Sequence, residues 1–178
     1  MHRGPALGLE SKTVRVVPYD ARWPQLYAAE AERITRALSD RGLSLELEHT
    51  GSTAVPGLAA KPIIDILAGR DAEASRPALI AALESAGYMY RGESGIPGRD
   101  FFRRGDPRSY HVHLVERGCQ FWNDHRAFRD YLRTHPDAAE AYAALKTELA
   151  RRFPKDRERY IDEKTDFVLG ILERSRSG

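Results

Sequence analysis

A segment of small and hydroxyl-bearing residues is the first feature of this sequence that can do chemistry. It contains Gly51, Ser52 and Thr53 in succession and Gly57 shortly afterwards. A loop of this composition leaves backbone N–H groups uncovered and adds hydroxyl donors, so it suits an anion, above all a phosphate. An ordinary tight turn explains the same residues without a ligand, and that alternative stays open.

Two charged residues follow this loop. Lys61 lies just beyond it, and Asp65 stands alone in the run Ile63-Ile64-Asp65-Ile66-Leu67. This run is apolar enough to form a strand that is buried on both faces. Because an unpaired carboxylate there would be strongly unfavourable, we expect Asp65 to meet a cation, a metal ion or strong hydrogen-bond donors. A structural aspartate bonded to loop amides is the alternative.

A pair of histidines, His111 and His113, provides the second signal. On a strand, residues i and i+2 share a face, so both imidazoles would project the same way. Two such rings can bind a metal, hold a phosphate or move protons, whereas the alternative is a solvated polar face. If adjacent strands bring them to Asp65, the three are candidate catalytic residues. Together with Glu48, expected to point from its strand end towards the loop, they are also candidate metal ligands.

Several cationic residues are placed where they can neutralise a bound anion. Arg99 and Arg103 are an even number of residues apart, so they can share a strand face and clamp a phosphate. Lys146 and Lys164 fall within the apolar stripes of two predicted helices, so each should find an anion or extend to water. Solvated arginines and extended lysines are the alternatives.

The elements that must position these residues follow from hydrophobic periodicity and from glycine and proline positions. Strands dominate the middle of the chain and helices its end, which predicts an α+β or α/β fold with a mixed sheet flanked by helices. We expect strands near 13–17, 43–49, 63–67, 88–90, 99–104 and 109–116, helices near 22–38, 76–85, 122–134, 137–152 and 157–174, and a flexible tail over residues 1–11.

Composition narrows the class of protein. A chain of 178 residues predicts one domain, residues 1–178, with a sizeable core. Its net charge of +2 is too small to indicate binding to duplex nucleic acid, although small phosphorylated ligands remain compatible with it. Cys119 is the single cysteine, which excludes an internal disulfide and a thiolate zinc site. With no signal peptide and no membrane-spanning run in the sequence, we expect a cytoplasmic protein that does not bind membranes.

Taken together, these motifs resemble the GrpB-like family of bacterial proteins over almost the whole chain. The resemblance rests on the run from Glu48 to Asp65, and it is supported by Val16–Asp20 with Trp23, Tyr110–His113, Phe128–Leu132, Tyr142 with Lys146, and Tyr160 with Lys164. It implies a nucleotidyltransferase-like fold with a C-terminal helical segment packed on the sheet.

The resemblance also implies roles for individual residues. In the nucleotidyltransferase superfamily a Gly-Ser pair, here Gly51-Ser52, binds nucleotide phosphates. Acidic residues two apart on the next strand hold magnesium. Asp65 matches the first acidic position, whereas the second falls on Leu67, which cannot coordinate a metal. The two histidines suit zinc or manganese better than magnesium.

The leading hypothesis is an enzyme that transfers a nucleotidyl group from a nucleoside triphosphate to a small acceptor, with a bound divalent metal, Mg, Mn or Zn. The candidate substrate-binding residues are Gly51, Ser52, Thr53, Lys61, Arg99, Arg103, Lys146 and Lys164. One alternative is a protein of the same fold that binds a nucleotide or another anion without catalysis. The other is a metal-dependent hydrolase built on Asp65, His111 and His113. The sequence leaves the acceptor and the oligomeric state open.

Overall fold

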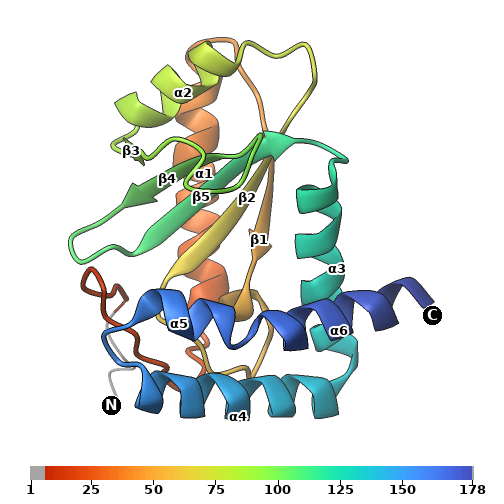
Figure 1. Cartoon of the computed structure of the whole chain (residues 1–178). Helices are drawn as coiled ribbons and strands as arrows, with labels where there is room; N and C mark the ends of the chain where they lie inside the picture. Colours follow the sequence, from red (N-terminus) through yellow and green to blue (C-terminus); the bar gives the residue numbers. More distant parts are fainter. Residues whose placement is uncertain (1–6, 178) are drawn as a thin grey trace.

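The computed structural model describes residues 7–177. The elements in chain order are α1 (Trp23–Ser39), β1 (Glu46–Thr50), the short 3-10 helix η1 (Ser52–Ala54), β2 (Ile64–Arg70), α2 (Arg76–Ser85), β3 (Met89–Tyr90), β4 (Asp100–Arg104), β5 (Tyr110–Glu116), α3 (Gln120–Thr134), α4 (Pro136–Arg152), α5 (Arg157–Asp162) and α6 (Thr165–Ser177). Figure 1 shows their arrangement. The predicted α+β class and all the long helices up to Arg152 are confirmed.

A five-stranded mixed sheet in the order β1-β2-β5-β4-β3 forms the centre of the fold. Only β2 and β5 are parallel neighbours; the other pairs are antiparallel. The parallel pair requires a long crossover, which α2, β3 and β4 provide. As a result, β2 and β5 lie side by side at the middle of the sheet, although they are far apart in sequence.

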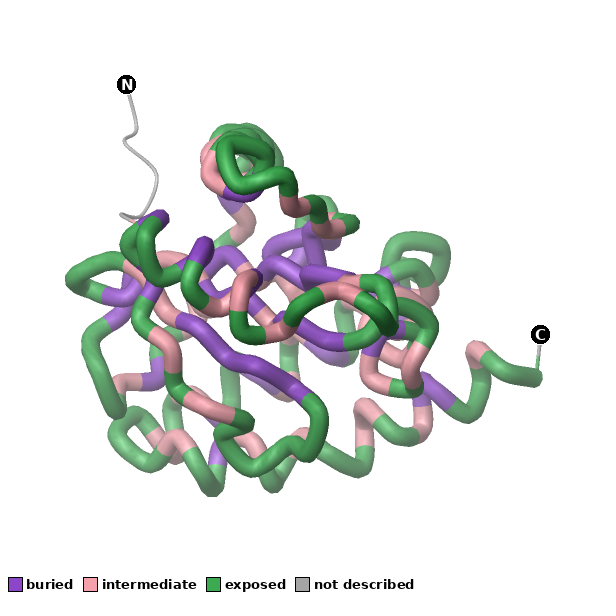
Figure 2. Tube along the Cα trace, turned by 90° about the horizontal axis from the view of Figure 1, so that it is seen from above, coloured by how far each residue is buried: buried purple, intermediate pink, exposed green. Residues whose placement is uncertain are grey.

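One face of the sheet is covered by α1 and α2 and holds the main hydrophobic core (Figure 1). Alternate residues of each strand point to this face because side chains on a strand alternate. The fully buried members include Trp23, Ile34, Leu38, Leu79, Ile64, Ile66, Ala68, Phe102, Val112 and Leu114. Burial of each large side chain contributes about 1.5–3 kcal/mol. Figure 2 shows that buried segments gather towards the middle of the molecule.

The buried carboxylate of Glu30 fastens α1 to the sheet within this layer. Glu30 is 4% exposed. It accepts hydrogen bonds from Arg33 at 2.7 Å, Tyr88 at 2.5 Å and Arg104 at 2.9 Å. Because its charge is matched by two guanidinium groups, this carboxylate stabilises the contact between α1 and β4.

The C-terminal helices complete the other side of the molecule. α3 packs on the second face of the sheet, and α4, α5 and α6 lie across the end where β2 begins (Figure 1). Val55, Leu58, Leu132, Tyr142 and Ile171 form a separate cluster that joins this layer to the loop after β1. None of the described helices is both long and apolar enough to cross a lipid bilayer.

Two predicted elements are wrong. Residues 13–17 form no strand, because only Val17 makes an isolated bridge, to Ala60, and Val14 bonds instead to Pro154. The helix predicted over 157–174 is broken into α5 and α6. The break lets Tyr160 pack with Val14 in one apolar cluster while the following turns of α6 pack in another.

The predicted flexible tail is also shorter than residues 1–11. Its first six residues lie outside the described part of the chain. Leu9 is only 3% exposed, and its N–H donates to the carbonyl of Arg108 at 3.0 Å. Gly8 similarly donates to the carbonyl of Pro62 at 2.7 Å. Residues 8 and 9 are therefore tied to the sheet.

Packing of α3 on the sheet gives a first prediction. A Cβ added at Gly69 would lie 2.7 Å from the ring of Trp122, whereas one at Gly170 would meet nothing within 4 Å. We expect Gly69→Ala to lower the free energy of unfolding by about 1–3 kcal/mol. Gly170→Ala, the matched control, should leave it unchanged or raise it by up to about 1 kcal/mol. Urea denaturation measures both, and equal stabilities would contradict the close packing of α3.

Candidate functional site

Strand register brings the central polar residues together. Asp65, near the start of β2, lies opposite Thr50 of β1 and His111 of β5, and His111 lies opposite Arg103 of β4. Residues that pair across neighbouring strands project from the same face. Thr50, Asp65, His111 and Arg103 therefore form one row across the sheet, on the face opposite α1 and α2. His113 lies on this face two residues further along β5.

The carboxylate of Asp65 and the imidazoles of His111 and His113 form a compact cluster. Oδ1 of Asp65 lies 3.1 Å from Nδ1 of His111 and 3.3 Å from Nε2 of His113. The histidine side chains are 9% and 12% exposed, whereas Asp65 retains 31%. Asp65 therefore opens towards solvent on this face and is less buried than its apolar neighbours in sequence indicate. The predicted meeting of these three residues is confirmed.

Burial and hydrogen bonding set the charges of this cluster. Burial opposes ionisation of Asp65, but hydrogen bonds from His111 and His113 outweigh it and hold its pKa well below the usual range. Burial lowers the pKa of His111 to about 4, against the opposing effect of Asp65. At neutral pH the cluster therefore holds an ionised carboxylate beside a neutral His111, the form in which both can bind a cation.

The donor set of this cluster fits a transition metal. Among the described residues, one ligand atom from each of Asp65, His111 and His113 lies within 4.8 Å of the others. Two imidazole nitrogens and one carboxylate oxygen suit zinc or manganese better than magnesium, which prefers oxygen ligands. Nε2 of His111 is buried and has no hydrogen-bond partner among the described residues. The position of a second carboxylate is filled by Leu67, which is fully buried against Trp122.

Glu48 does not join this cluster as expected. It lies on β1 opposite Leu67, and its carboxylate is held by two arginines of α3. Arg126 lies 3.2 Å from it, and Arg129, which is only 6% exposed, donates a hydrogen bond to it. The prediction that Glu48 is a metal ligand is wrong in this structure, because these ion pairs satisfy its charge.

The glycine-containing loop lies directly against Asp65. Gly51 has a φ of +71°, and a Cβ at this position would lie 2.9 Å from Oδ2 of Asp65. Only glycine combines this backbone conformation with so close an approach. Thr53 is 2% exposed, and its hydroxyl is hydrogen-bonded to His49 at 3.0 Å. The loop therefore presents Ser52, and not the Thr53 hydroxyl, to the site.

Lys146 reaches this loop from α4. Its Nζ donates to Oγ of Ser52 at 2.8 Å and to the carbonyl of Ala59 at 2.5 Å. Lys146 is 2% exposed, and burial, with the charges of Lys164 and Lys61, holds its pKa well below the usual range. The predicted inward orientation of this lysine is confirmed, and its neighbours are other cations instead of an acid.

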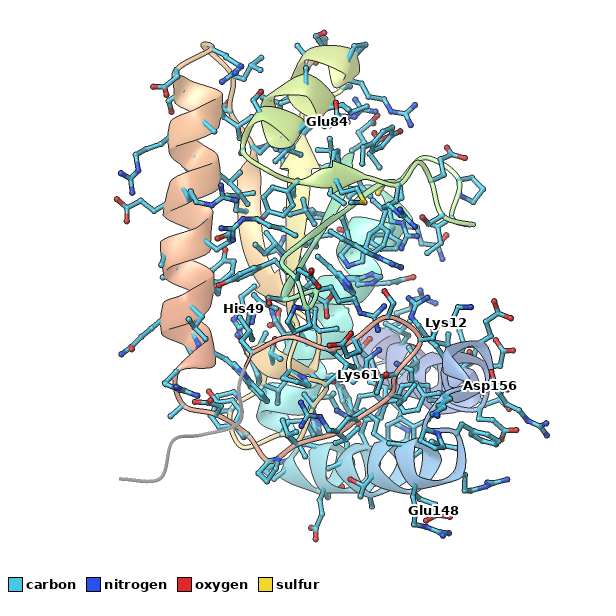
Figure 3. The ribbon with its side chains drawn as sticks, turned by 90° about the vertical axis from the view of Figure 1, so that its left-hand side faces the viewer. Lys12, His49, Lys61, Glu84, Glu148 and Asp156 are labelled. Atoms are coloured by element: carbon cyan, nitrogen blue, oxygen red, sulfur yellow. The ribbon has the colours of Figure 1, made fainter. Side chains whose placement is uncertain are left out.

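Lys61 and Lys164 both lie close to the Tyr160 ring. Their Nζ atoms are 5.3 Å and 5.1 Å from its centroid. Figure 3 shows Lys61 where the end of the sheet meets the C-terminal helices. Burial and then the charge of Lys164 lower the pKa of Lys61 to about 7. The hydroxyl of Tyr160 is buried and has no hydrogen-bond partner among residues 7–177.

Arginines extend this positive charge along the sheet. Arg99 donates to the carbonyls of Glu93 and Ser94 and lies 3.4 Å from Nδ1 of His113. Arg103 lies over the ring of Phe101. The charge of Arg157 acts on Arg99 and Arg103. Arg157 was missed from the sequence because the position of α5 depends on the helix break, for which the sequence carries no local signal.

The site as a whole is unbalanced in charge. In the described part of the chain, no ion pair involves Lys61, Lys146, Lys164, Arg99, Arg103, Arg108 or Arg157. Asp65 is the acid whose charge acts on Lys61, Arg99 and Arg108. Buried cations without anionic partners are costly. This arrangement therefore suits a ligand that carries several negative charges.

Comparison with known proteins agrees with the resemblance read from the sequence. A family model described as GrpB protein matches residues 13–174. A UPF0157 protein of Pseudomonas aeruginosa is 46% identical over 167 residues, which cover 91% of this chain and 67% of that protein. UPF0157 protein YqkA of Bacillus subtilis is 35% identical over 166 residues. That match covers 93% of this chain but 48% of YqkA, so the chain spans about half of that relative.

Solved structures agree on the fold. The crystal structure of the conserved protein GrpB from Enterococcus faecalis has a TM-score of 0.81 and 35% identity, and the match covers 90% of this chain and 96% of that one. The Cid1 poly (U) polymerase, solved with MgGTP, has a TM-score of 0.56 and 11% identity over 77% of this chain and 45% of its own. The latter likeness shows the fold alone, and the predicted nucleotidyltransferase-like fold is confirmed.

The lowered pKa of Lys61 predicts a pH-dependent stability. The folded-state pKa of about 7 lies below the ordinary lysine value of 10.5. Between these pH values the unfolded chain therefore binds more protons, and stability rises with pH. Lys61→Met removes this penalty. At pH 7 the variant should therefore have a larger free energy of unfolding than the wild type. This difference should be smaller at pH 10 than at pH 7 by at least about 1.4 kcal/mol.

Chemical denaturation at both pH values, in buffer without multivalent anions, measures this change. Lys155→Met is the control, because Lys155 is exposed on the loop after α4 and its substitution should have the same effect at both pH values. An advantage of Lys61→Met that does not depend on pH would contradict the burial of this amine among cations.

Proposed function

This chain belongs to the GrpB family, and from the site that it carries we propose that it transfers a nucleotidyl group from a nucleoside triphosphate to a small acceptor. The observation that carries the proposal is the group of lysines without acidic partners, which adjoins the Gly51-Ser52 loop and Asp65. A triphosphate carries several negative charges, which these lysines need as partners. The nucleotidyltransferase-like fold is consistent with this use.

Binding of the triphosphate uses the end of the sheet where the C-terminal helices lie. Lys61 and Lys164 supply ammonium groups beside the Tyr160 ring, and the hydroxyl of Tyr160, which has no hydrogen-bond partner among residues 7–177, adds a donor. Lys146 already donates to Ser52, so it holds the loop in place as well as adding charge. Preorganised cations of this kind stabilise the negative charge that develops on a leaving pyrophosphate.

A divalent metal would be held by Asp65, His111 and His113, the cluster whose donor atoms fit manganese or zinc. Bound there, it would supply a Lewis acid for phosphate oxygens. The chain keeps Asp65 ionised, because hydrogen bonds from both imidazoles stabilise the negative charge of its carboxylate. Gly51 keeps the Oδ2 side of this carboxylate accessible, because any side chain at that position would contact it.

The reaction that we propose is a single displacement at phosphorus. A hydroxyl oxygen of the acceptor forms a bond to the α-phosphorus, and the bond from that phosphorus to the bridging oxygen breaks. Pyrophosphate leaves with the electron pair of that bond, against the lysines. The proton of the acceptor hydroxyl passes to solvent water.

A second candidate function is metal-dependent hydrolysis, in which water takes the place of the acceptor hydroxyl. The observation that favours it is the donor set, because two histidines and one carboxylate with an open position are typical of hydrolytic zinc sites. Hydrolysis is also favoured by the presence of Leu67 at the position where two-metal nucleotidyl transfer requires a second carboxylate. Binding of a nucleotide without turnover is the remaining alternative.

Substitution of Asp65 tests the transferase. Asp65→Asn removes the charge that both imidazoles stabilise, so we expect at least a 100-fold loss of pyrophosphate release from nucleoside triphosphates. The control Asp40→Asn, at the exposed end of α1, should retain full activity. Pyrophosphate is measured with each of the four triphosphates, Mg²⁺ or Mn²⁺, and pools of small hydroxyl compounds. Full release by Asp65→Asn would refute the proposed role.

Metal content separates the two candidate reactions. We expect protein dialysed against Mn²⁺ or Zn²⁺ to retain one ion per chain by elemental analysis, and His111→Ala or His113→Ala to retain less than a tenth of that amount. His135→Ala is the control, since His135 is exposed on the helix junction away from this cluster. Tight zinc with no use of triphosphates would favour the hydrolase, and equal metal in all variants would contradict the cluster.

A further inference from the structure

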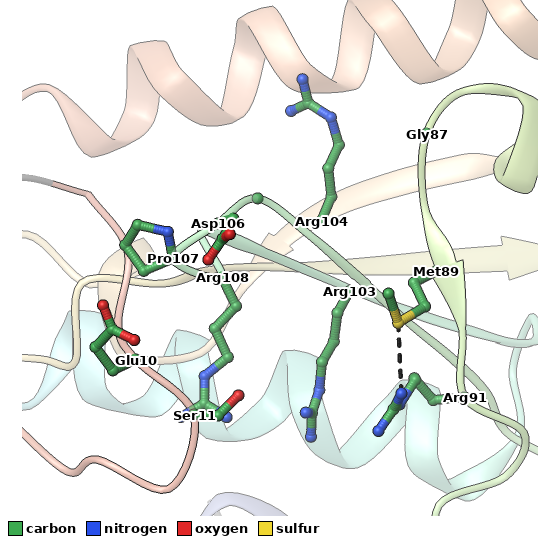
Figure 4. Close-up of a pocket in the computed structure, with 11 residues that line it drawn as sticks. Glu10, Ser11, Gly87, Met89, Arg91, Arg103, Arg104, Asp106, Pro107 and Arg108 are labelled. Atoms are coloured by element: carbon green, nitrogen blue, oxygen red, sulfur yellow. Dashed lines mark hydrogen bonds between the residues drawn. The ribbon is translucent and has the colours of Figure 1, made fainter.

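A separate pocket opens on the same face of the sheet, beyond Arg103 from the site described above. It has a volume of about 290 Å³ and lies between the N-terminal segment, β3 and the turn that joins β4 to β5 (Figure 4). Its charged lining residues are Glu10, Arg91, Arg103, Arg104, Asp106 and Arg108. Neither Asp65 nor a histidine lines it, so it is distinct from the candidate metal site.

Strand register connects this pocket to Asp65. Met89, Arg103, His111 and Asp65 are successive partners across β3, β4, β5 and β2. Neighbouring strands are about 4.8 Å apart, so the backbone of Arg103 lies about 10 Å from that of Asp65. A molecule of modest length can therefore reach from the pocket to the carboxylate along one row of the sheet.

The arginines of the pocket have unused hydrogen-bonding capacity. The Nε atoms of Arg103 and Arg108 are buried and have no hydrogen-bond partner among the described residues. Arg108 is only 7% exposed, and the one hydrogen bond of its side chain within the described part of the chain is to the carbonyl of Thr13 at 3.5 Å. Buried donors without acceptors cost free energy, so a ligand that accepts from them would be favoured. In Figure 4 both side chains extend to the same side of the sheet.

The charge of the pocket is positive. Burial and the nearby Arg108, Arg157 and Arg91 lower the pKa of Arg103 to about 10, which records how closely these cations are gathered. Glu10 and Asp106 lie at the exposed rim. Arg104 points the other way in Figure 4, towards its partner Glu30 on α1. The pocket therefore presents guanidinium groups whose charge is not balanced by a buried acid.

We propose that this pocket binds a phosphate group of the acceptor substrate. The inference rests on the proposed function and narrows it: the acceptor is a small phosphorylated molecule whose hydroxyl lies at Asp65 while its phosphate lies on Arg103 and Arg108. Guanidinium groups match phosphate oxygens in geometry as well as in charge. The distance between the two sites limits the acceptor to roughly the length of a phosphorylated sugar or polyol.

The experiment uses inorganic phosphate as the probe and a parent protein that carries Lys61→Met and Lys164→Met, so that the lysine site contributes little. Isothermal titration calorimetry should show phosphate binding in the parent, and at least a tenfold weaker affinity after adding Arg103→Met or Arg108→Met. Arg36→Met, the control on the exposed surface of α1, should leave phosphate affinity unchanged. Acetate at equal concentration should bind more weakly than phosphate.

A second measurement distinguishes loss of phosphate binding from loss of the fold. In the folded full-length protein, the arginine Nε–Hε NMR signals that disappear in Arg103→Met and Arg108→Met should be those that shift on addition of phosphate. The conservative Arg103→Lys should recover part of the affinity. Phosphate that binds equally well to the parent and to both arginine variants, or shifts neither signal, overturns the inference.

These outcomes are separate from those for the proposed function. Loss of phosphate binding with the arginines, in a protein that does not use triphosphates, would support the pocket and refute the transferase. Turnover that depends on Asp65, with phosphate affinity independent of Arg103 and Arg108, would support the transferase and refute the pocket.

Discussion

Positive charge without a matching negative charge is the constraint on which the rest of this structure depends. Lys61, Lys146 and Lys164 gather at one end of the sheet, where burial and repulsion between cations disfavour the protonated forms of Lys61 and Lys146. The buried carboxylate of Glu30, in contrast, is paired with two arginines, and the partly buried carboxylate of Glu48 is paired with Arg129. This contrast supports the proposal that the lysines bind a ligand, since a merely structural role would be served better by apolar side chains.

The fold explains how these charges come together. The parallel pairing of β2 with β5 places Asp65 beside His111, and α3 closes the remainder of that face, with Trp122 packed on Gly69. The helices after Thr134 then bring Lys146 and Lys164 against the loop and the end of the sheet. Each part makes a different contribution: the strands supply the candidate metal-binding cluster, the loop allows close approach to Asp65, and the helices supply positive charge.

Much of this arrangement is predictable from the sequence. The alternation of His111 and His113 on a strand and the isolated Asp65 in an apolar run indicate one cluster, and the lysines within apolar helical stripes indicate inward orientation. Each of these sequence patterns is local, because it depends only on the spacing of side chains within one strand or one helix. The family resemblance adds the fold, which the solved GrpB structure from Enterococcus faecalis supports.

The errors arise where the outcome depends on packing between distant segments. Glu48 has the residue type and the strand position of a metal ligand, but Arg129, far along the chain, takes its charge. The contribution of Arg157 depends on a helix break that lets Tyr160 join a separate apolar cluster. None of these partners can be identified from local spacing.

The central claim is that one site holds both a metal and a polyphosphate. A crystal of the wild-type chain grown with Mn²⁺ and a non-hydrolysable nucleoside triphosphate tests it most directly, with manganese located by anomalous scattering. The account predicts a manganese peak bound by Asp65, His111 and His113, and phosphate oxygens within hydrogen-bond distance of Lys61 and Lys164. Manganese elsewhere, or a nucleotide bound away from these lysines, would contradict it.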